Sequence, residues 1–371
     1  MINSFLGSEE MTDFSSVFQH LYKERRVLVT GHTGFKGSWL SLWLQRLGAY
    51  VVGYSLDPPS TPNHYDLLKL DVTSIRGDVR DRETLFDCFS RYKPEIVFHL
   101  AAQSLVRCSI VDPIYTFETN FMGTVNVLEA SRITDSVKAV IIVTSDKCYE
   151  NKEWIWAYRE NDRLGGSDPY SASKACVELV AASYRNLLAR DSFGIATARA
   201  GNVIGGGDWA KDRIIPDAVR AVSGNTEMRV RCPDAVRPWQ HVLEPLYGYL
   251  LLGYKLFAEG NGYGGAWNFG PDQNEVNSVI WVLKYLRRRF HNLRWEISTV
   301  RNGYEAGVLR IDSSKSRLML GWQPLWNLEE ALERTIQWYE CYLGGGDVRS
   351  LSESQVAEYE AGVLMRWKGS K

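Results

Sequence analysis

The sequence has little that would suit it to nucleic acids, membranes or structural metals. Its 43 basic and 44 acidic residues give a formal charge of −1, which excludes the broad basic field typical of nucleic-acid binding. The longest apolar run, near residues 247–252, is far shorter than the ~20 residues that a membrane-spanning helix needs. The 6 cysteines are scattered and form no CxxC pair, so we expect neither a metal site nor a redox dithiol.

An export signal is also missing from the start of the chain. Glu9, Glu10 and Asp13 stand where a signal peptide would carry basic residues and an apolar run. Together with the unpaired cysteines, this predicts a cytoplasmic protein. The 371 residues, 45% of them apolar, are enough for two or three domains with a large core. Trp (13) and Tyr (19) are frequent; Trp39 and Trp43 on the first expected helix are interpreted as packing residues.

The first half of the sequence alternates short apolar runs with helical stretches. Glycine 48 closes an expected helix over 38–47. Another helix begins at Asp112 and Pro113, a cap followed by proline at the first helical position. Its apolar residues repeat every three or four positions and predict one helix face: Ile114, Phe117, Phe121, Val125 and Leu128. The expected strands are 26–30, 50–54, 96–101, 137–144 and 194–200. This alternation predicts an α/β fold, a Rossmann-type parallel sheet with helices on both faces.

The pattern changes after about residue 205, where glycine and proline become frequent. We interpret 1–204 as the Rossmann domain and 205–345 as mainly a smaller α/β lobe, from which the chain has the option of crossing back to the first domain. Glycines 344–346 then precede a C-terminal helical tail over 346–371.

A glycine-rich segment, TGHTGFKG at 30–37, follows a strand and opens a helix. Glycines there let the backbone turn tightly and approach a pyrophosphate at the positive end of the helix. Lys36 precedes the last glycine, unlike the lysine of a nucleoside-triphosphate loop. We predict a dinucleotide site; the alternative is an ordinary glycine-rich turn. The candidate residues are Gly31, Thr33, Gly34, Phe35, Lys36 and Gly37.

Polar residues follow the second and third strands, where a dinucleotide would place its adenosine. Either Ser55 or Asp57 is expected to hold the ribose, and a negative Asp57 favours NAD over NADP. Asp57 is alternatively part of a turn with the following prolines. Asp78, followed by Val79, is placed to reach the adenine or simply to cap the next helix.

Two further motifs carry groups that handle protons. Tyr170 and Lys174 stand four apart on one helix face, where an ammonium would lower the tyrosine pKa and make the phenol a base. Ser145, Asp146 and Lys147 follow Thr144 at the carboxyl end of an expected strand, where ligands bind in parallel sheets. The alternative for this second motif is a polar loop with a helix cap.

Taken together, the glycine-rich loop, HLAA at 99–102 and the YxxxK motif at 170–174 resemble the extended short-chain dehydrogenase/reductase superfamily. The likeness continues to about residue 330. Within that superfamily, the longer runs are most similar to the CDP-glucose 4,6-dehydratase family. These runs are 31–44, 144–151, 168–174, 199–213 and 237–245.

The resemblance implies a tightly bound NAD that is reduced and reoxidised in one cycle. Tyr170 would take the proton of the sugar 4-hydroxyl, and Lys174 would hold the nicotinamide ribose and lower the tyrosine pKa. Ser145 would bond the substrate oxygen, and Asp146 would protonate the departing 6-hydroxyl. Lys147 is either a neutral base at C5 or a cation that stabilises the enolate. The cofactor set would also include Leu100, Ala101, Ala102, Gln103 and Thr144.

The resemblance also implies a nucleotide-sugar site in the second lobe. Asn202 and Arg237 match positions near the diphosphate, and Trp209, Arg213 and Trp239 would line the same cleft, although the two tryptophans suit packing between lobes equally well. At 303–307 the chain reads GYEAG, including the candidate Tyr304, where the family has a PHEAH segment. The exact nucleotide and sugar therefore stay open.

Other readings of the same motifs remain. A nucleotide-sugar 4-epimerase of the same fold would need no acid to expel a hydroxyl, and a non-catalytic NAD-binding protein would need no intact tyrosine and lysine. The resemblance further implies a homodimer, or alternatively a tetramer, that pairs through the helices after Pro113 and from Tyr170.

Overall fold

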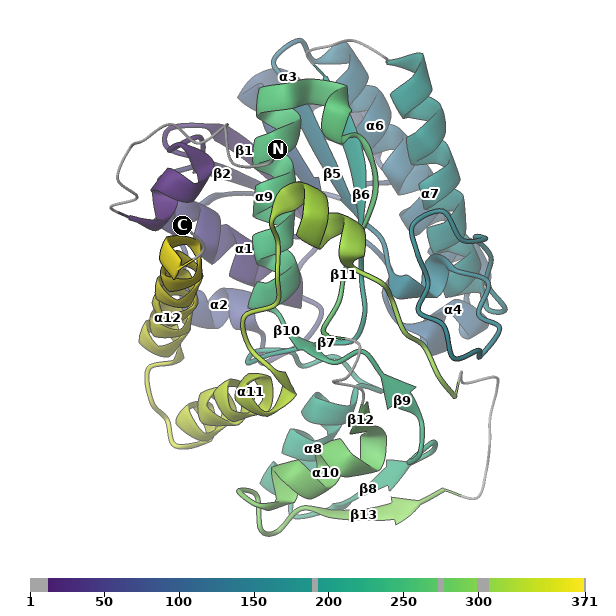
Figure 1. Cartoon of the computed structure of the whole chain (residues 1–371), viewed down its shortest axis with the longest axis vertical. Coiled ribbons are helices and arrows are strands. Elements are labelled where there is room, and N and C mark those ends of the chain that lie inside the picture. The colour runs from purple at the N-terminus through teal and green to yellow at the C-terminus, as the bar shows by residue number, and fades with distance from the viewer. Residues whose placement is uncertain (1–12, 189–192, 273–276, 299–306, 370–371) are drawn as a thin grey trace.

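A computed structural model describes residues 13–188, 193–272, 277–298 and 307–369. Its centre is a seven-stranded sheet whose strands all run parallel, in the order β11-β6-β5-β4-β1-β2-β3 (Figure 1). The strands are β1 (Arg26–Thr30), β2 (Tyr50–Ser55), β3 (Thr73–Arg76), β4 (Ile96–His99), β5 (Ala139–Val143), β6 (Gly194–Ala200) and β11 (Gly265–Phe269). The predicted parallel Rossmann-type sheet is confirmed.

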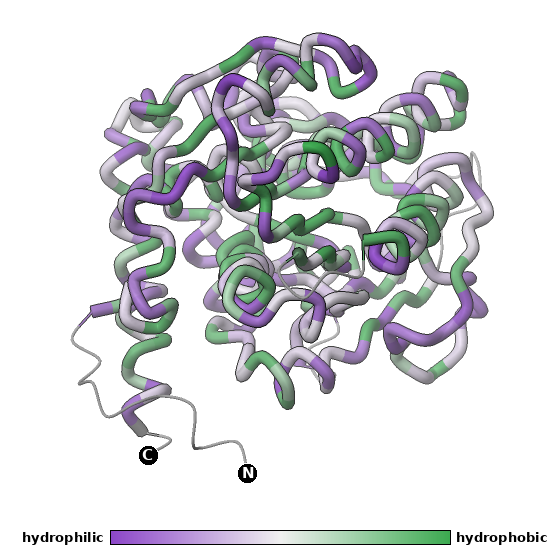
Figure 2. The backbone as a smooth tube through the Cα atoms, turned by 90° about the horizontal axis from the view of Figure 1, so that it is seen from above, coloured by the Kyte–Doolittle hydropathy of each residue, from purple (hydrophilic) through white to green (hydrophobic). Residues whose placement is uncertain are grey.

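Helices cover both faces of this sheet because its strands are apolar on both sides. Val27 and Val29 face α1 (Phe35–Arg46) and α9 (Leu243–Glu259), whereas Leu28 between them faces the opposite core. That second core is covered by α3 (Arg82–Tyr92), α6 (Gly123–Ile133) and α7 (Pro169–Leu187). Seen from above in Figure 2, hydrophobic and hydrophilic segments alternate along the helices, as expected for elements with one buried face.

The helix expected after Asp112 differs from its prediction. It is divided into α5 (Pro113–Phe117), a π-helical turn (Glu118–Met122) and α6. A π turn inserts an extra residue and rotates the helix face, so the predicted apolar positions do not share one environment. Leu128 is fully buried, whereas Ile114 is 71% exposed. Asp112 caps α5 and proline follows it, as the sequence predicts.

After residue 205 the chain builds a small lobe, drawn at the bottom of Figure 1. It contains α8 (Ile214–Ser223) and α10 (Val279–Arg287), with the strand pairs β8–β13 and β9–β12. These strands are β8 (Glu227–Val230), β9 (Val236–Arg237), β12 (Asn277–Ser278) and β13 (Arg294–Ile297). Another short pair, β7 (Val203–Ile204) and β10 (Gln240–His241), lies between the parts. Between β10 and β12 the chain returns to the large sheet with α9 and β11, and it then completes the small lobe with β12, α10 and β13.

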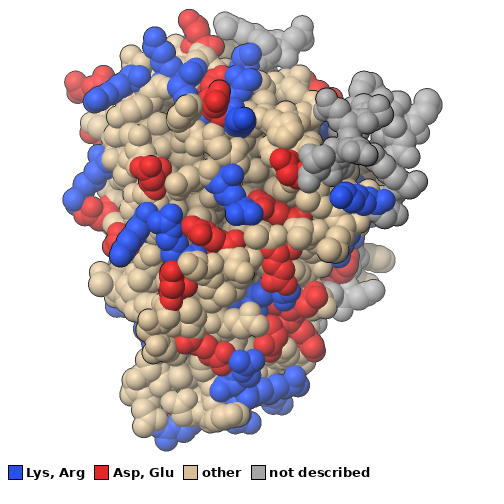
Figure 3. All heavy atoms as spheres, turned by 90° about the vertical axis from the view of Figure 1, so that its left-hand side faces the viewer, with Lys and Arg blue, Asp and Glu red and all other residues tan. Residues whose placement is uncertain are grey.

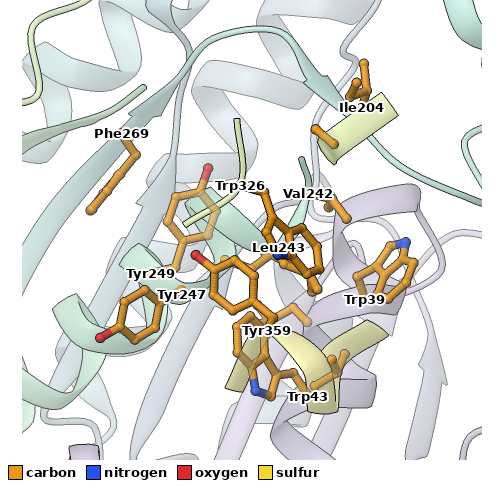
Figure 4. Close-up of a cluster of buried hydrophobic side chains, with 14 of the residues drawn as sticks. Trp39, Trp43, Ile204, Val242, Leu243, Tyr247, Tyr249, Phe269, Trp326 and Tyr359 are labelled. Atoms are coloured by element: carbon orange, nitrogen blue, oxygen red, sulfur yellow. The ribbon is translucent and has the colours of Figure 1, made fainter. Parts of the chain in front are cut away.

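Two C-terminal helices, α11 (Leu328–Leu343) and α12 (Val348–Gly369), flank glycines 344–346 and pack beside the first helices. Figure 4 shows Trp39 and Trp43 of α1 among side chains of α9 and α12, which include Tyr247 and Tyr359. Both tryptophans are fully buried. The Trp43 indole nitrogen donates to Glu360 Oε1 at 3.0 Å, which ties α12 to the Rossmann domain.

Shorter elements complete the described chain: η1 (Phe14–Phe18), α2 (His64–Leu68), α4 (Val106–Val111), η3 (Asp146–Cys148), η4 (Gly260–Tyr263) and the π turn η5 (Ser316–Leu320). On the face in Figure 3, basic and acidic residues are interspersed, in keeping with the near-zero net charge. Among the helices that the structure describes, none combines the length and apolar character of a membrane span.

Candidate active site

A cavity of about 1290 Å³ opens at the carboxyl edge of the parallel sheet and extends into the small lobe. Gly31 follows β1 and Leu100 follows β4, and both line the cavity. β1 and β4 are adjacent, but the chain continues from β1 toward one edge of the sheet and from β4 toward the other. In such folds ligands usually bind in the crevice between two strands of this kind. The far wall comes from residues between Ala200, at the end of β6, and Trp239 of the small lobe.

The glycine-rich loop has no room for side chains at two positions. Gly31 has φ +76°, and a Cβ atom on it would lie 2.7 Å from the Ala101 nitrogen. A Cβ atom on Gly37 would lie 2.0 Å from the Gly31 carbonyl oxygen. Gly34 precedes α1 without a side-chain cap, so the first N–H groups of α1 are not satisfied by a cap. This cradle fits a pyrophosphate at a helix N-terminus.

The residues predicted for the adenosine end surround the same cavity. The hydroxyl groups of Thr33 and Ser55 form a hydrogen bond of 2.8 Å. The exposed Asp57 carboxylate forms an ion pair with Arg76. Asp78 forms an ion pair with the Arg80 guanidinium. Burial acts to raise the pKa of Asp78, but the hydrogen bonds and the positive charge of Arg80 outweigh it and lower this pKa. The residue that caps α3 is Asp81, so the capping alternative for Asp78 does not hold. Lining residues here are Thr33, Ser55, Asp57, Asp78 and Val79.

After β4 the chain lines the cavity, with one exception among the predicted cofactor residues. Leu100, Ala101 and Ala102 line the cavity, but Gln103 does not. The Gln103 amide donates to Leu105 O and to Thr116 Oγ1, both at 3.0 Å, and its oxygen accepts from Leu105 N at 2.6 Å. The side chain is thus used to build the loop, and Ser104 lines the cavity in its place.

The turn after β5 holds a serine, an aspartate and a lysine beside one another. Ser145 caps the short helix η3 by accepting from Lys147 N at 3.2 Å, so it does act as a helix cap. Its hydroxyl also donates to Asp146 Oδ1 at 3.0 Å. Asp146 is 3% exposed, and burial raises the pKa of its carboxyl although Lys147 and Ser145 act to lower it. A buried carboxyl that keeps its proton more readily is suited to act as an acid.

Tyr170 and Lys174 lie on the first turns of α7, which Asp168 caps and Pro169 opens. Burial raises the pKa of Tyr170 to about 12, while a hydrogen bond with Ser145 and the charge of Arg213 act to lower it. This differs from the expected pKa depression by Lys174. The Lys174 ammonium instead donates to Val143 O at 3.1 Å, and burial lowers the pKa of Lys174 to about 8.

Lys36 of the glycine-rich loop interacts by charge with Asp146 in the turn after β5. Burial and the positive charge of Arg213 lower the pKa of Lys36 to about 7, whereas Asp146 acts to raise it. Lys36, in the predicted cofactor loop, therefore interacts by charge with residues of the predicted substrate end of the cavity.

The described residues predicted for the nucleotide sugar line the cavity, Asn202 from the segment after β6 and the others from the small lobe: Trp209, Arg213, Arg237 and Trp239. Arg213 Nη1 donates to Asp208 Oδ2 at 2.9 Å, which holds the guanidinium over the cavity. Trp239 is 4% exposed and its indole donates to Asn277 O at 3.1 Å, so it packs within the lobe as well as lining the wall. Trp209 lies edge-on against Tyr339 and Tyr342. Tyr304 lies outside the described residues.

The structure adds cavity residues that the sequence analysis missed. Arg231, at the end of β8, lines the cavity and shares the carboxylate of Asp212 with Arg107 of α4. Asp212 thus bridges the small lobe and the Rossmann domain. The sequence contains no clear signal for this contact, because the two arginines are far apart along the chain and lie in short elements.

The parallel sheet, the glycine cradle and the Ser145, Tyr170 and Lys174 cluster define an extended short-chain dehydrogenase/reductase. A family model described as GDP-mannose 4,6 dehydratase matches residues 28–255, and the chain belongs to this family. The CDP-glucose 4,6-dehydratase of Salmonella typhimurium is 45% identical over 92% of this chain and 98% of its own length. A UDP-glucose 4-epimerase of Halalkalibacterium halodurans is 27% identical over 85% of this chain and 95% of its own.

Solved structures share the fold. The epimerase Mth375 of Methanothermobacter thermautotrophicus matches with TM-score 0.79 and 24% identity, over 92% of this chain and 98% of that one. The dTDP-glucose 4,6-dehydratase of Bacillus anthracis in complex with NAD matches with TM-score 0.70 and 20% identity, over 85% and 96%.

Proposed function

We propose that this chain is an NAD-dependent nucleotide-sugar 4,6-dehydratase whose substrate is CDP-glucose. The observation that carries the proposal is one cavity in which the acid–base turn of Ser145, Asp146 and Lys147 faces Tyr170 and Lys174. The 45% identity to a CDP-glucose 4,6-dehydratase supports the same reaction.

The cavity suits NAD at its Rossmann end. The loop at 31–37 would receive the pyrophosphate at the N-terminus of α1, and glycine at position 37 permits its tight turn because a Cβ atom there would collide with the Gly31 backbone. Ser55 or Asp57 would hold the adenosine ribose, Asp78 would lie at the adenine, and Lys174 would hold the nicotinamide ribose. When bound, NAD accepts a hydride from the sugar and later returns it. The negative charge of Asp57 favours NAD over its 2′-phosphorylated form.

Tyr170 accepts the proton of the sugar 4-hydroxyl as C4 is oxidised. The Ser145 hydroxyl binds the same substrate oxygen and, through its hydrogen bond with Tyr170, favours the deprotonated phenol. Burial holds the Tyr170 pKa at about 12 even with this hydrogen bond and the positive charge of Arg213, so proton transfer at neutral pH needs further positive charge beside the phenol.

Asp146 and Lys147 carry the second half-reaction. The new 4-ketone acidifies the C5 proton, and loss of that proton together with the 6-hydroxyl releases one water. Asp146 donates a proton to the leaving hydroxyl, in keeping with its raised pKa. Lys147 is essential, either as the base at C5 or as the cation that stabilises the enolate. Addition of the hydride to C6 and of a proton to C5 would then saturate the C5=C6 double bond and give the 4-keto-6-deoxy sugar.

The small lobe binds the nucleotide diphosphate. Arg213 and Arg237 are its guanidinium ligands, and Asn202 with the two cavity tryptophans completes the pocket. The enzyme works as a homodimer through α5, α6 and α7, with a tetramer as the alternative. Exposed apolar residues on α5, on the π turn before α6 and on α7 support the pairing: Ile114, Met122 and Leu179. Sedimentation of wild type and of Ile114→Glu would test it.

Incubation with CDP-glucose and with other nucleoside-diphosphate glucoses tests the reaction and the nucleotide. We expect CDP-glucose to give a 4-keto product with a C6 methyl group and no net reduced NAD. A product that keeps its C6 hydroxyl contradicts the dehydratase.

A 4-epimerase is the second candidate, because several similar proteins have that name. It would give a C4 epimer in the same assay, and NMR of the product sugar separates the two reactions. The Asp146–Lys147 pair favours dehydration, since epimerisation expels no hydroxyl.

A further inference from the structure

We propose that a buried ion pair behind the active-site wall, Glu178 with Arg199, positions the catalytic turn 144–149 by holding both of its ends. Neither residue lines the main cavity. The inference rests on the proposed function, because it assigns a positioning role to residues that do not touch the substrate.

The first end of the turn is held through Glu178. This residue lies on α7, four positions after Lys174, and its side chain is 3% exposed, as is that of Arg199. Its Oε1 accepts from Thr144 Oγ1 at 2.5 Å. Its Oε2 accepts from Thr197 Oγ1 at 2.6 Å and from Arg199 Nη2 at 2.7 Å. The carboxylate thus connects α7 and β6 to the residue that precedes Ser145.

The second end is held through Arg199 on β6. Arg199 Nη1 donates to the Tyr149 hydroxyl at 2.7 Å and to Glu160 O at 3.0 Å. Tyr149 in turn donates to Asn268 Oδ1 on β11 at 2.8 Å. Ser145, Asp146 and Lys147 therefore lie between Thr144, which is bonded to Glu178, and Tyr149, which is bonded to Arg199.

The ion pair also places a negative charge behind Lys174. Burial acts to raise the pKa of Glu178, but Arg199 and the hydrogen bonds from Arg199, Thr144 and Thr197 bring it below its usual value, so the carboxyl stays ionised. Burial lowers the pKa of Lys174 to about 8, and Glu178 opposes this. The other groups that interact with Lys174 by charge are Cys148 on the turn, His99 on β4 and Lys36 on α1.

A buried ion pair is weak evidence for stability, because well-packed apolar residues often serve as well. Its value here is geometric. An apolar replacement would leave the hydroxyl groups of Thr144 and Tyr149 without these partners and free the turn that carries the acid. Catalysis is sensitive to such freedom, since a misplacement near 1 Å costs about 100-fold in rate.

Two mild variants test the anchors one at a time. Thr144→Val and Tyr149→Phe each remove one hydroxyl and leave both charges paired. We expect kcat to fall by about 10- to 100-fold with little change in KM. Hydrogen exchange of the peptide spanning 144–149 should accelerate while the melting temperature stays near that of wild type.

Two control variants lose a comparable buried hydrogen bond elsewhere. Tyr22→Phe loses the hydrogen bond from the tyrosine hydroxyl to Leu250 O. Thr335→Val loses the hydrogen bond from the threonine hydroxyl to Ala331 O. Both should keep wild-type kcat and unchanged exchange at 144–149. The proposal is overturned if the two test variants match these controls.

The charge of Glu178 is tested in a double variant, Glu178→Gln/Arg199→Met, because Glu178→Gln alone would leave Arg199 buried and unpaired. The high-pH limb of kcat should move to lower pH, since Lys174 loses its carboxylate neighbour. An unmoved limb contradicts this charge role. If wild type itself does not convert CDP-glucose, the proposed substrate fails, whereas the exchange measurements still decide whether the ion pair orders the turn.

Discussion

The Ser145 hydroxyl donates to one carboxylate oxygen of Asp146 at 3.0 Å, and the other oxygen of Asp146 is buried without a hydrogen-bond partner among the described residues. The two neighbours therefore have separate tasks available. The serine hydroxyl also acts to lower the pKa of Tyr170, whereas the second aspartate oxygen has its hydrogen-bonding capacity unused. This asymmetry suits one group that orients a substrate oxygen and another that delivers a proton.

Asp146→Asn should separate the two half-reactions. The amide retains the shape of the carboxyl but has no proton to give to the leaving hydroxyl. We expect oxidation at C4 to continue and overall turnover to fall about 10²- to 10⁴-fold. Reduced cofactor should then accumulate during turnover, visible by its absorbance. Equal slowing of oxidation and water loss would remove Asp146 from the acid role.

Tyr170→Phe should abolish the first oxidation because the base is removed while the ring still fills its site. The expected loss of kcat is about 10²- to 10⁴-fold, with the melting temperature near that of wild type. Tyr249→Phe is the matched control, since the buried Tyr249 hydroxyl has no hydrogen-bond partner among the described residues. Turnover in Tyr170→Phe comparable to that control would show that another group takes the proton.

Gly37→Ala should prevent cofactor binding, because the added Cβ atom would lie 2.0 Å from the Gly31 carbonyl oxygen and displace the loop. The NAD content of the purified protein, measured after denaturation, should fall to a small fraction of the wild-type value. Gly262→Ala is the control, as a Cβ atom there meets nothing within 4 Å. A full complement of NAD in Gly37→Ala would place the cofactor elsewhere.

The stability of the fold should decrease as the pH falls from 7 to 5. Burial lowers the pKa of His64, His99 and His241 to about 3, whereas unfolded histidine titrates near 6.5. The unfolded state thus binds more protons in this range, and by pH 5 each histidine costs about 2 kcal/mol. Denaturant unfolding at both pH values measures the loss; equal free energies of unfolding would contradict the neutral buried histidines.

Glu244 opposes this trend and provides an internal check. Burial raises its pKa to about 7, above the unfolded value of 4.5, so its contribution to stability grows as the pH falls through that interval. The Glu244→Gln variant removes this contribution, and its stability should therefore fall more steeply between pH 7 and 5 than that of wild type. A slope no steeper than that of wild type would rule out the opposing role of Glu244.

Local sequence patterns were enough to predict the elements that hold the site. Apolar runs mark β1, β2, β4, β5 and β6, because a strand buried on both faces leaves little choice of residue. The glycine spacing at 31–37 predicts the tight loop before α1, since a Cβ atom at Gly31 or Gly37 would lie only 2.7 or 2.0 Å from backbone atoms. The interval between Tyr170 and Lys174 places both on one helix face. The π turn in the helix after Asp112 was not predicted, because a single inserted residue leaves no clear periodic signal.

What the sequence determined by itself is therefore local: which backbone segments extend or coil, and which groups are the candidates for holding a pyrophosphate and for transferring protons. Only the tertiary structure decided what surrounds those groups. The tertiary structure directs the Gln103 side chain into the loop after β4 and raises the pKa of Tyr170 by burial. It also pairs Glu178 with Arg199 behind the turn 144–149. Desolvation and pairing between distant segments depend on packing across the whole fold, and a linear pattern carries no measure of either.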